Sequence, residues 1–179
     1  HKFTFVVVNI HLNKPLVVFD LETTGVQIAT DRVVEIYCIK IQPDGTEEHL
    51  HQVLNPTIPI PPQVSEIHGI WDKDVEGKPT FAEFSKELNN FLGDCDFGGF
   101  NSNRFDFPML AEEFYRAGVA FDTNRKFIDA QRIFHKMEPR NLTAAYQKYC
   151  GKDLIDAHSA KADTVATWEI IKAQVDYYD

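Results

Sequence analysis

The chain has 179 residues, of which 44% are hydrophobic and 12% aromatic, and its formal net charge is −9. This length and composition favour one folded domain with its own core and exclude a disordered chain. The acidic balance argues mildly against nucleic-acid binding, unless some of the carboxylates hold divalent cations where a phosphate would bind.

Processing and compartment signals are few. His1 stands in place of a Met, so residues 1–14 are interpreted as a tag-derived segment or an extra strand, and residues 15–179 as the folded domain. No apolar run of about 18 residues and no secretory signal pattern is present, which predicts a protein without a membrane partner. The three cysteines, an odd number without CxxC spacing, disfavour a disulfide framework or zinc knuckle and indicate a reducing cytoplasm.

The first half of the chain predicts an antiparallel meander. Apolar and β-branched runs predict strands over residues 16–20, 32–41 and 46–54. The proline-rich segment 55–62 cannot be a central strand or a helix interior, and a short helix over residues 63–70 is predicted to follow it.

The second half predicts helices alternating with strands. Thr80 is placed as the N-cap of a helix, and Glu83 completes a capping box. The elements expected after it are a strand over 96–100, a helix from Asp106 closed by Gly118, a strand over 126–129, and helices over 130–137, 142–150 and about 159–177. Asn141 is placed as the N-cap of the helix over 142–150, and Gly151 ends that helix. This order indicates an α/β fold, a mixed five-stranded sheet of three antiparallel and additional parallel strands flanked by helices.

Two carboxylates end the first predicted strand. Asp20 and Glu22 would point to the same face of that strand, and their charges repel unless a cation lies between them. A divalent metal ion could be that cation. A lone DxE is nevertheless weak evidence, because solvated acids at a strand end are common.

Two later segments strengthen the metal interpretation. Asp106 follows a strand at the start of a helix, with Asn101 and Phe105 beside it, and His158 precedes Asp163 by about one helical turn. Each pattern has an ordinary alternative: an acid at a helix N-terminus, or a capping histidine with a solvated aspartate. The occurrence of all three patterns in this order favours a shared site.

The chain resembles the DEDDh 3′–5′ exonucleases, the DnaQ-like group of the ribonuclease-H-like superfamily, over residues 16–176. Its motifs match DxETTG at 20–25, NxxxFD at 101–106 and HxxxxD at 158–163. A further stretch, EIHGI at 66–70, resembles the segment that lies against the 3′ end in the DNA polymerase III epsilon proofreading subunit. The family often has a histidine where this chain has Phe100.

The resemblance implies a ribonuclease-H-like sheet and an enzyme that releases nucleoside monophosphates from the 3′ end of single-stranded DNA. It implies two Mg²⁺ or Mn²⁺ ions, with Asp20 bridging them, Glu22 and Asp163 on the nucleophile side, and Asp106 supporting the other ion. Histidine, whose ordinary pKa is about 6.5, is suited to take a proton from the attacking water, and this role falls to His158. Implied substrate contacts are Leu21, Thr23, His68, Asn101 and Phe105.

Several alternatives stay open. For Phe105 a core position is as plausible as substrate contact, and His49 and His51 indicate an exposed strand edge more than a metal site. The chain could also be an exoribonuclease of the same fold, or a weakly catalytic scaffold that binds nucleic acid or a DNA polymerase subunit. Tyr149 and Asp153 match the spacing of the sister group that uses tyrosine, but Gly151 between them would break the required helix.

Overall fold

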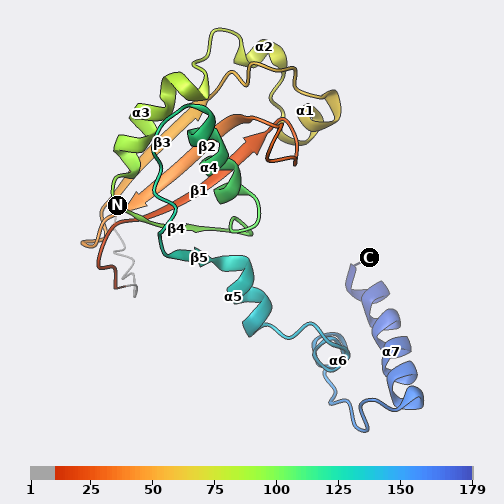
Figure 1. Cartoon of the computed structure of the whole chain (residues 1–179). Helices are drawn as coiled ribbons and strands as arrows, with labels where there is room; N and C mark the ends of the chain where they lie inside the picture. Colours follow the sequence, from red (N-terminus) through yellow and green to blue (C-terminus); the bar gives the residue numbers. More distant parts are fainter. Residues whose placement is uncertain (1–10, 179) are drawn as a thin grey trace, which may run out of the picture. The chain divides into compact units, whose positions relative to one another are not determined.

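The computed structural model describes residues 11–178 as two compact units, the first ending at Gln131 and the second beginning at Arg132 (Figure 1). The predicted N-terminal segment lies mostly outside the described residues, and the division into residues 1–14 and 15–179 stays a prediction. Within residues 11–178 we find no helix with the length and apolarity needed to span a membrane.

A five-stranded sheet forms the first unit. Strands β1 (Leu16–Thr23), β2 (Val33–Ile41) and β3 (Glu47–Val53) are antiparallel neighbours, whereas β4 (Asp96–Gly99) and β5 (Phe127–Asp129) extend the sheet in parallel. The strand order is β3-β2-β1-β4-β5. The predicted mixed sheet is therefore confirmed, with three antiparallel strands and a parallel extension.

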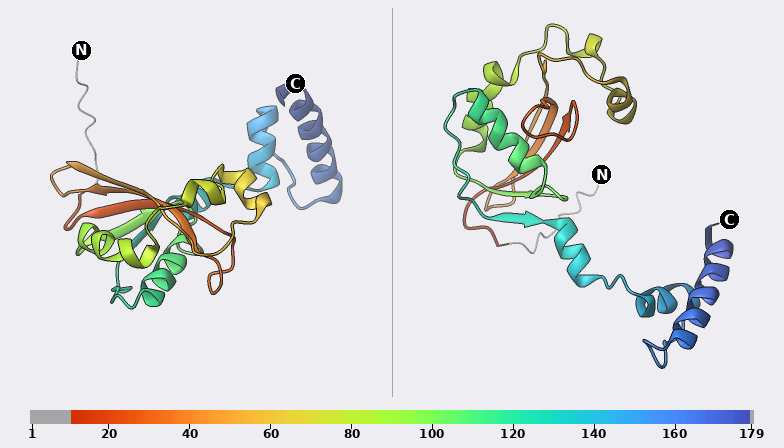
Figure 2. Two further views of the ribbon diagram at one scale, coloured as in Figure 1. Left: turned by 90° about the horizontal axis from the view of Figure 1, so that it is seen from above. Right: turned by 45° about the vertical axis from the view of Figure 1, so that its right-hand side comes forward.

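Helices α3 (Phe81–Leu92) and α4 (Asp106–Arg116) cover one face of this sheet (Figure 2). The predicted capping box is present, because the Thr80 hydroxyl accepts a hydrogen bond from the Glu83 N–H and the Glu83 carboxylate accepts one from the Thr80 N–H. The helix faces and the sheet enclose the main core, whose fully buried side chains include Val17, Ile36, Leu88, Phe97, Leu110 and Phe114.

Two short helices, α1 (Pro62–His68) and α2 (Asp72–Val75), connect β3 to α3. The first was predicted. The second was not, because it has four residues and follows a tryptophan, which is not a residue type that favours N-caps.

The chain continues from β5 into α5 (Ala130–Met137), and the second unit also contains α6 (Leu142–Cys150) and α7 (Ala160–Tyr178). Tyr146 of α6 packs against Ala166 and Ile170 of α7. Asn141 caps α6, and Gly151 ends it in the left-handed conformation, as predicted. All three cysteines are free, and Cys38 and Cys95 are buried packing residues.

Candidate active site

The end of β1 presents Asp20 and Glu22. Parallel pairing with β4 covers only residues 16–18 of β1, so the last part of this strand has an open edge. Alternation along the strand places Leu21 in the core, while Asp20 is exposed and Glu22 partly exposed. Partial burial raises the pKa of both carboxyl groups, and the charge of Asp20 raises the pKa of Glu22 further.

Asp106, the first residue of α4, brings a third carboxylate to the end of β1. Its side chain is buried, and burial raises its pKa to about 6, with the negative charge of Asp20 as the next cause. Within the described part of the chain, no lysine or arginine forms an ion pair with Asp20, Glu22 or Asp106. The effect of the Asp20 charge on the pKa of Asp106 shows that the structure brings the first two motifs together. The two segments place like charges near each other without a lysine or arginine of the described residues to pair with them.

The TTG part of the first motif shapes the loop that follows β1. The Thr24 hydroxyl donates to Asp31 Oδ1 over 2.8 Å and accepts a hydrogen bond from the Arg32 N–H over 3.0 Å. A Cβ at Gly25 would lie 2.6 Å from Asp31 Oδ2, so a side chain there would displace the carboxylate that the Thr24 hydroxyl and the Gln27 N–H hold. The Thr23 hydroxyl donates to the Gly25 carbonyl over 2.6 Å. These residues fix the backbone just beyond the carboxylates.

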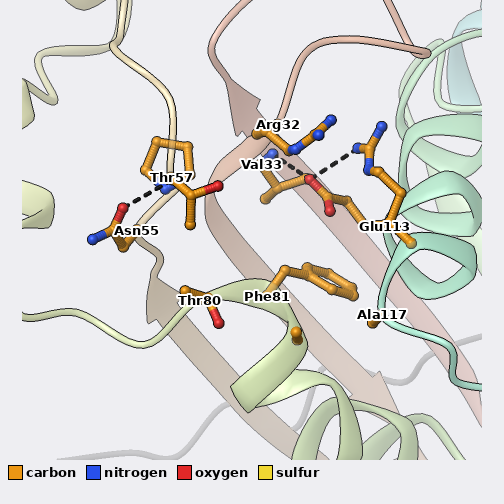
Figure 3. A pocket seen from close by; sticks show the side chains of 11 residues that line it. Arg32, Val33, Asn55, Thr57, Thr80, Phe81, Glu113 and Ala117 are labelled. Carbon is orange, nitrogen blue, oxygen red and sulfur yellow. Dashed lines mark hydrogen bonds and ion pairs between the residues drawn. The ribbon is translucent and has the colours of Figure 1, made fainter.

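The buried Glu113 and the partly buried Arg116, both on α4, contact this loop and the start of β2. Glu113 Oε1 accepts a hydrogen bond from the Val33 N–H over 2.9 Å and forms an ion pair of 3.1 Å with Arg116 (Figure 3). Arg116 in turn donates to the carbonyls of Ile28, over 3.1 Å, and Asp31, over 3.0 Å. The pair lines a pocket of about 210 Å³ beside the start of β2. Sequence reasoning missed this pair, because its partners lie far away in the chain.

The second motif forms the turn between β4 and α4. Asn101 is exposed and adopts a left-handed φ of 60°, and its N–H donates to the buried Asp129 over 2.9 Å. Phe105, directly before α4, packs partly against the main core. Its packing supports the core alternative, and Leu21 is likewise a core side chain, so any substrate contact by Leu21 falls to its backbone.

His68 ends α1 and carries a free ring nitrogen. Its Nδ1 accepts a hydrogen bond from the Ile70 N–H over 3.1 Å, so in the neutral ring the proton sits on Nε2. That Nε2 is buried and has no hydrogen-bond partner among the described atoms. His68 also lies close enough to Glu22 to oppose the rise in the pKa of that carboxyl group. A donor near the carboxylates is therefore available.

The third motif lies in the second unit, at the entry to α7. His158 adopts a left-handed φ of 74°, and its N–H donates to Asp163 Oδ1 over 3.3 Å. Asp163 lies in the first turn of α7, where its N–H donates to the Ser159 carbonyl. The predicted local geometry of this motif is present. Its convergence with the carboxylates of the first unit stays a prediction.

The alternative sites are less suited to metal binding or catalysis. His51 pairs with Glu35 over 2.6 Å, and His49 contacts the Tyr37 hydroxyl over 2.9 Å, on an exposed strand surface. Tyr149 lies inside α6, whereas Asp153 follows the helix end, as the intervening glycine predicted. Across residues 11–178, no three His, Cys, Asp or Glu side chains are gathered closely enough to hold a metal ion.

Comparison with known proteins now adds to this geometry. The model of the RNase_T exonuclease family matches residues 17–171. The chain belongs to this family of DnaQ-like 3′–5′ exonucleases. Members of the family typically use divalent metal ions.

The relatives come from bacterial DNA polymerase III. The chain is 25% identical over 168 residues to the PolC-type DNA polymerase III of Halalkalibacterium halodurans, matching 90% of this chain and 12% of that protein. It is 26% identical over 178 residues to the DNA polymerase III subunit epsilon of Treponema pallidum, matching 94% of this chain and 80% of the relative. The chain thus spans about an eighth of the PolC-type relative and most of the epsilon subunit.

Solved structures confirm the fold. Product-bound exonuclease I matches 90% of this chain and 43% of its own with a TM-score of 0.62 at 19% identity. Escherichia coli exonuclease I in complex with a dT13 oligonucleotide matches 91% of this chain and 41% of its own, with a TM-score of 0.60 at 21% identity. These likenesses support the ribonuclease-H-like exonuclease fold that the motifs predicted.

Proposed function

We propose that this exonuclease shortens single-stranded DNA from its 3′ end, releasing nucleoside monophosphates, with DNA preferred over RNA. The observation that carries the proposal is the pair of carboxylates formed by Asp106 and Asp20. Two distant segments bring these anions together, and no lysine or arginine of the described residues forms an ion pair with either of them. The burial of Asp106 makes its charge costly. Such an arrangement is stable when a bound cation shares the charge.

The chemistry of the donor set suits Mg²⁺ or Mn²⁺, and binding requires the carboxylates to move closer together than they lie in the described residues. Asp20, Glu22, Asp106 and Asp163 offer only carboxylate oxygens, which hard cations prefer, and the buried thiols of Cys38 and Cys95 belong to the core. We infer that the four acids hold two such ions. When bound, ions of this kind activate the attacking water and stabilise charge on the attacking and leaving oxygens of the phosphodiester.

The side chains of this protein supply the remaining chemistry. His158 accepts the proton of the attacking water. His68, with its proton on Nε2, donates to an oxygen of the terminal nucleotide. This bond would satisfy a buried nitrogen that has no hydrogen-bond partner among residues 11–178. Thr23 and Asn101 flank the same nucleotide. Water adds to phosphorus, and the bond from phosphorus to the 3′ oxygen of the preceding nucleotide breaks. That oxygen takes up a proton to become the new 3′ hydroxyl, and a nucleoside 5′-monophosphate is released.

We extend the proposal to the setting of the reaction. Both named relatives are parts of DNA polymerase III, so a DNA polymerase subunit is the protein partner we expect. The free thiols fit a reducing cytoplasm.

The test follows 5′-labelled single-stranded DNA and a matched RNA in the presence of Mn²⁺. Wild type should give a ladder that shortens from the 3′ end, faster on DNA. His158→Ala should lower the rate by about 10²–10⁴-fold, the usual contribution of a general base. His135→Ala, which removes an exposed histidine on α5, serves as the matched control and should leave the rate unchanged.

The outcomes separate the alternatives. Faster cleavage of RNA would identify an exoribonuclease. If neither strand is cut with excess Mn²⁺, while the DNA still binds, the chain is a scaffold. Full activity in Asp20→Ala or Asp163→Ala would overturn the catalytic assignment.

A further inference from the structure

Asp129, the last residue of β5, carries a carboxylate that the proposed chemistry does not use. It is 5% exposed, although it belongs to a chain of net charge −9. Its Oδ1 accepts two backbone hydrogen bonds, from the Asn101 N–H over 2.9 Å and from the Gln131 N–H over 3.0 Å. The first bond reaches across the sheet from β5 to the turn that carries the second motif.

That turn is tightly built. Asn101 holds a left-handed φ of 60°, which costs energy for a residue other than glycine. The next residue, Ser102, is fully buried, and its carbonyl accepts a hydrogen bond from the Phe107 N–H over 2.9 Å. A Cβ on Gly99 would overlap the Ser102 hydroxyl, so the turn packs directly against β4. A displacement at Asn101 would therefore pass to the start of α4, where Asp106 lies.

We propose that Asp129 is a positioning residue of the exonuclease site, which holds the Asn101 turn in its strained conformation and thereby fixes the Asp106 carboxylate. The catalytic part of this inference rests on the proposed function; the structural part does not. Asp129 touches neither substrate nor metal in this scheme and acts through the backbone of Asn101.

A simpler role for Asp129 is to cap α5, because Gln131 is the second residue of that helix. The two roles differ in what is lost on substitution. A pure cap would affect the start of α5 and leave the turn at Asn101 unchanged. A positioning residue would loosen residues 101–106 as well.

The first experiment measures backbone amide exchange in the metal-free protein. Asp129→Ala removes the acceptor of the Asn101 N–H, and the loss of such a bond should speed exchange across residues 101–106 by about tenfold or more. Asp129→Asn keeps one acceptor oxygen and should show a smaller effect. The matched control is Asp72→Ala, since Asp72 Oδ1 accepts the Ile60 N–H over 2.9 Å, remote in sequence from the three motifs.

The second experiment measures cleavage of single-stranded DNA as a function of Mn²⁺ concentration. Asp129→Ala should lower kcat at least about tenfold and raise the Mn²⁺ concentration needed for half-maximal rate, because a misplaced Asp106 weakens the ion site. Asp129→Asn should recover part of both, and Asp72→Ala should match wild type within about twofold.

Each outcome has one meaning. Unchanged exchange at residues 101–106 in Asp129→Ala overturns the proposal. Faster exchange with an unchanged Mn²⁺ dependence and kcat overturns its catalytic part. If wild type cuts no nucleic acid, the proposed function fails, while the exchange result still decides whether Asp129 holds the turn. If Asp129→Ala does not fold, Asp129→Asn decides by the same measurements.

Discussion

Arg116→Met should destabilise the protein more than the loss of an ordinary arginine would. The substitution removes donors to the carbonyls of Ile28 and Asp31. It leaves the Glu113 carboxylate, whose side chain is 4% exposed, with the Val33 N–H as its remaining partner among the described residues. Removing one partner of a buried ion pair costs about 3–5 kcal/mol. Because the Arg116 side chain is 18% exposed, we expect a loss at the lower end of this range, about 3 kcal/mol of the free energy of unfolding.

Urea unfolding followed by circular dichroism measures this loss. Arg125→Met is the matched control, because Arg125 also donates to backbone carbonyls, those of Gly93 over 2.7 Å, Cys95 over 3.0 Å and Asp122 over 2.9 Å. Unlike Arg116, it forms no ion pair with a carboxylate of residues 11–178. Its loss should cost about 1–2 kcal/mol, the range of ordinary hydrogen bonds. Only Arg116→Met should also slow DNA cleavage, because Arg116 holds the loop that follows the first motif.

A double-mutant cycle tests the physical cause. Glu113→Gln keeps an acceptor for the Val33 N–H and removes the charge, so on its own it should cost about 1–2 kcal/mol. With that charge gone, Arg116→Met no longer leaves a buried anion. The double variant should therefore lose about 1–2 kcal/mol less than the sum of the single variants. Strictly additive losses would refute the ion-pair reasoning.

Two further predictions concern the carboxylates and their loop. Burial and the charge of Asp20 raise the folded-state pKa of Asp106 from 3.8 to about 6. Ionisation of Asp106 should therefore lower the free energy of unfolding of the metal-free protein by about 3 kcal/mol. This loss of stability should be absent below pH 4 and complete above pH 6. Urea unfolding of wild type and Asp106→Asn at pH 4 and pH 8 in EDTA checks this; equal differences at both pH values would contradict it. Thr24→Val should cost about 1–3 kcal/mol, since it leaves the Arg32 N–H and Asp31 Oδ1 without their partner, and an unchanged midpoint of unfolding would show that water replaces the hydroxyl.

Local signals in the sequence were sufficient for most of the fold. Thr80 and Glu83 predicted the start of α3, and Asn141 with Gly151 predicted both ends of α6. These signals work because a cap satisfies backbone groups a few residues away, so the cause lies within the sequence window. The four-residue helix α2 carries no such capping signal in the sequence, because its single turn follows a tryptophan.

Long-range interactions could not be predicted in this way. Glu113 on α4 bonds to Val33 at the start of β2, and Asp129 at the end of β5 bonds to Asn101 in the turn after β4. In the sequence each acid is indistinguishable from a solvated one, because its partner is a backbone N–H that every residue other than proline offers. The motif acids could be found because their residue types and order carry information; the acids that hold them in place could not.

Backbone strain in this protein is concentrated near the second and third motifs. Among residues 11–178, the residues other than glycine with positive φ are Thr57, Asn101, Asp156 and His158. Three of the four lie in or beside the second and third motifs. Strain of this kind persists only where surrounding bonds enforce it, as the Asp129 carboxylate does at Asn101 and the Asp163 carboxylate does at the His158 N–H. An acid therefore accepts a hydrogen bond from the N–H of each of these two strained residues, and at His158 that acid is also a proposed metal ligand. Neutralising the ligand Asp163 should thus disturb the conformation of His158 as well as the ion site, so the two contributions to catalysis cannot be removed independently.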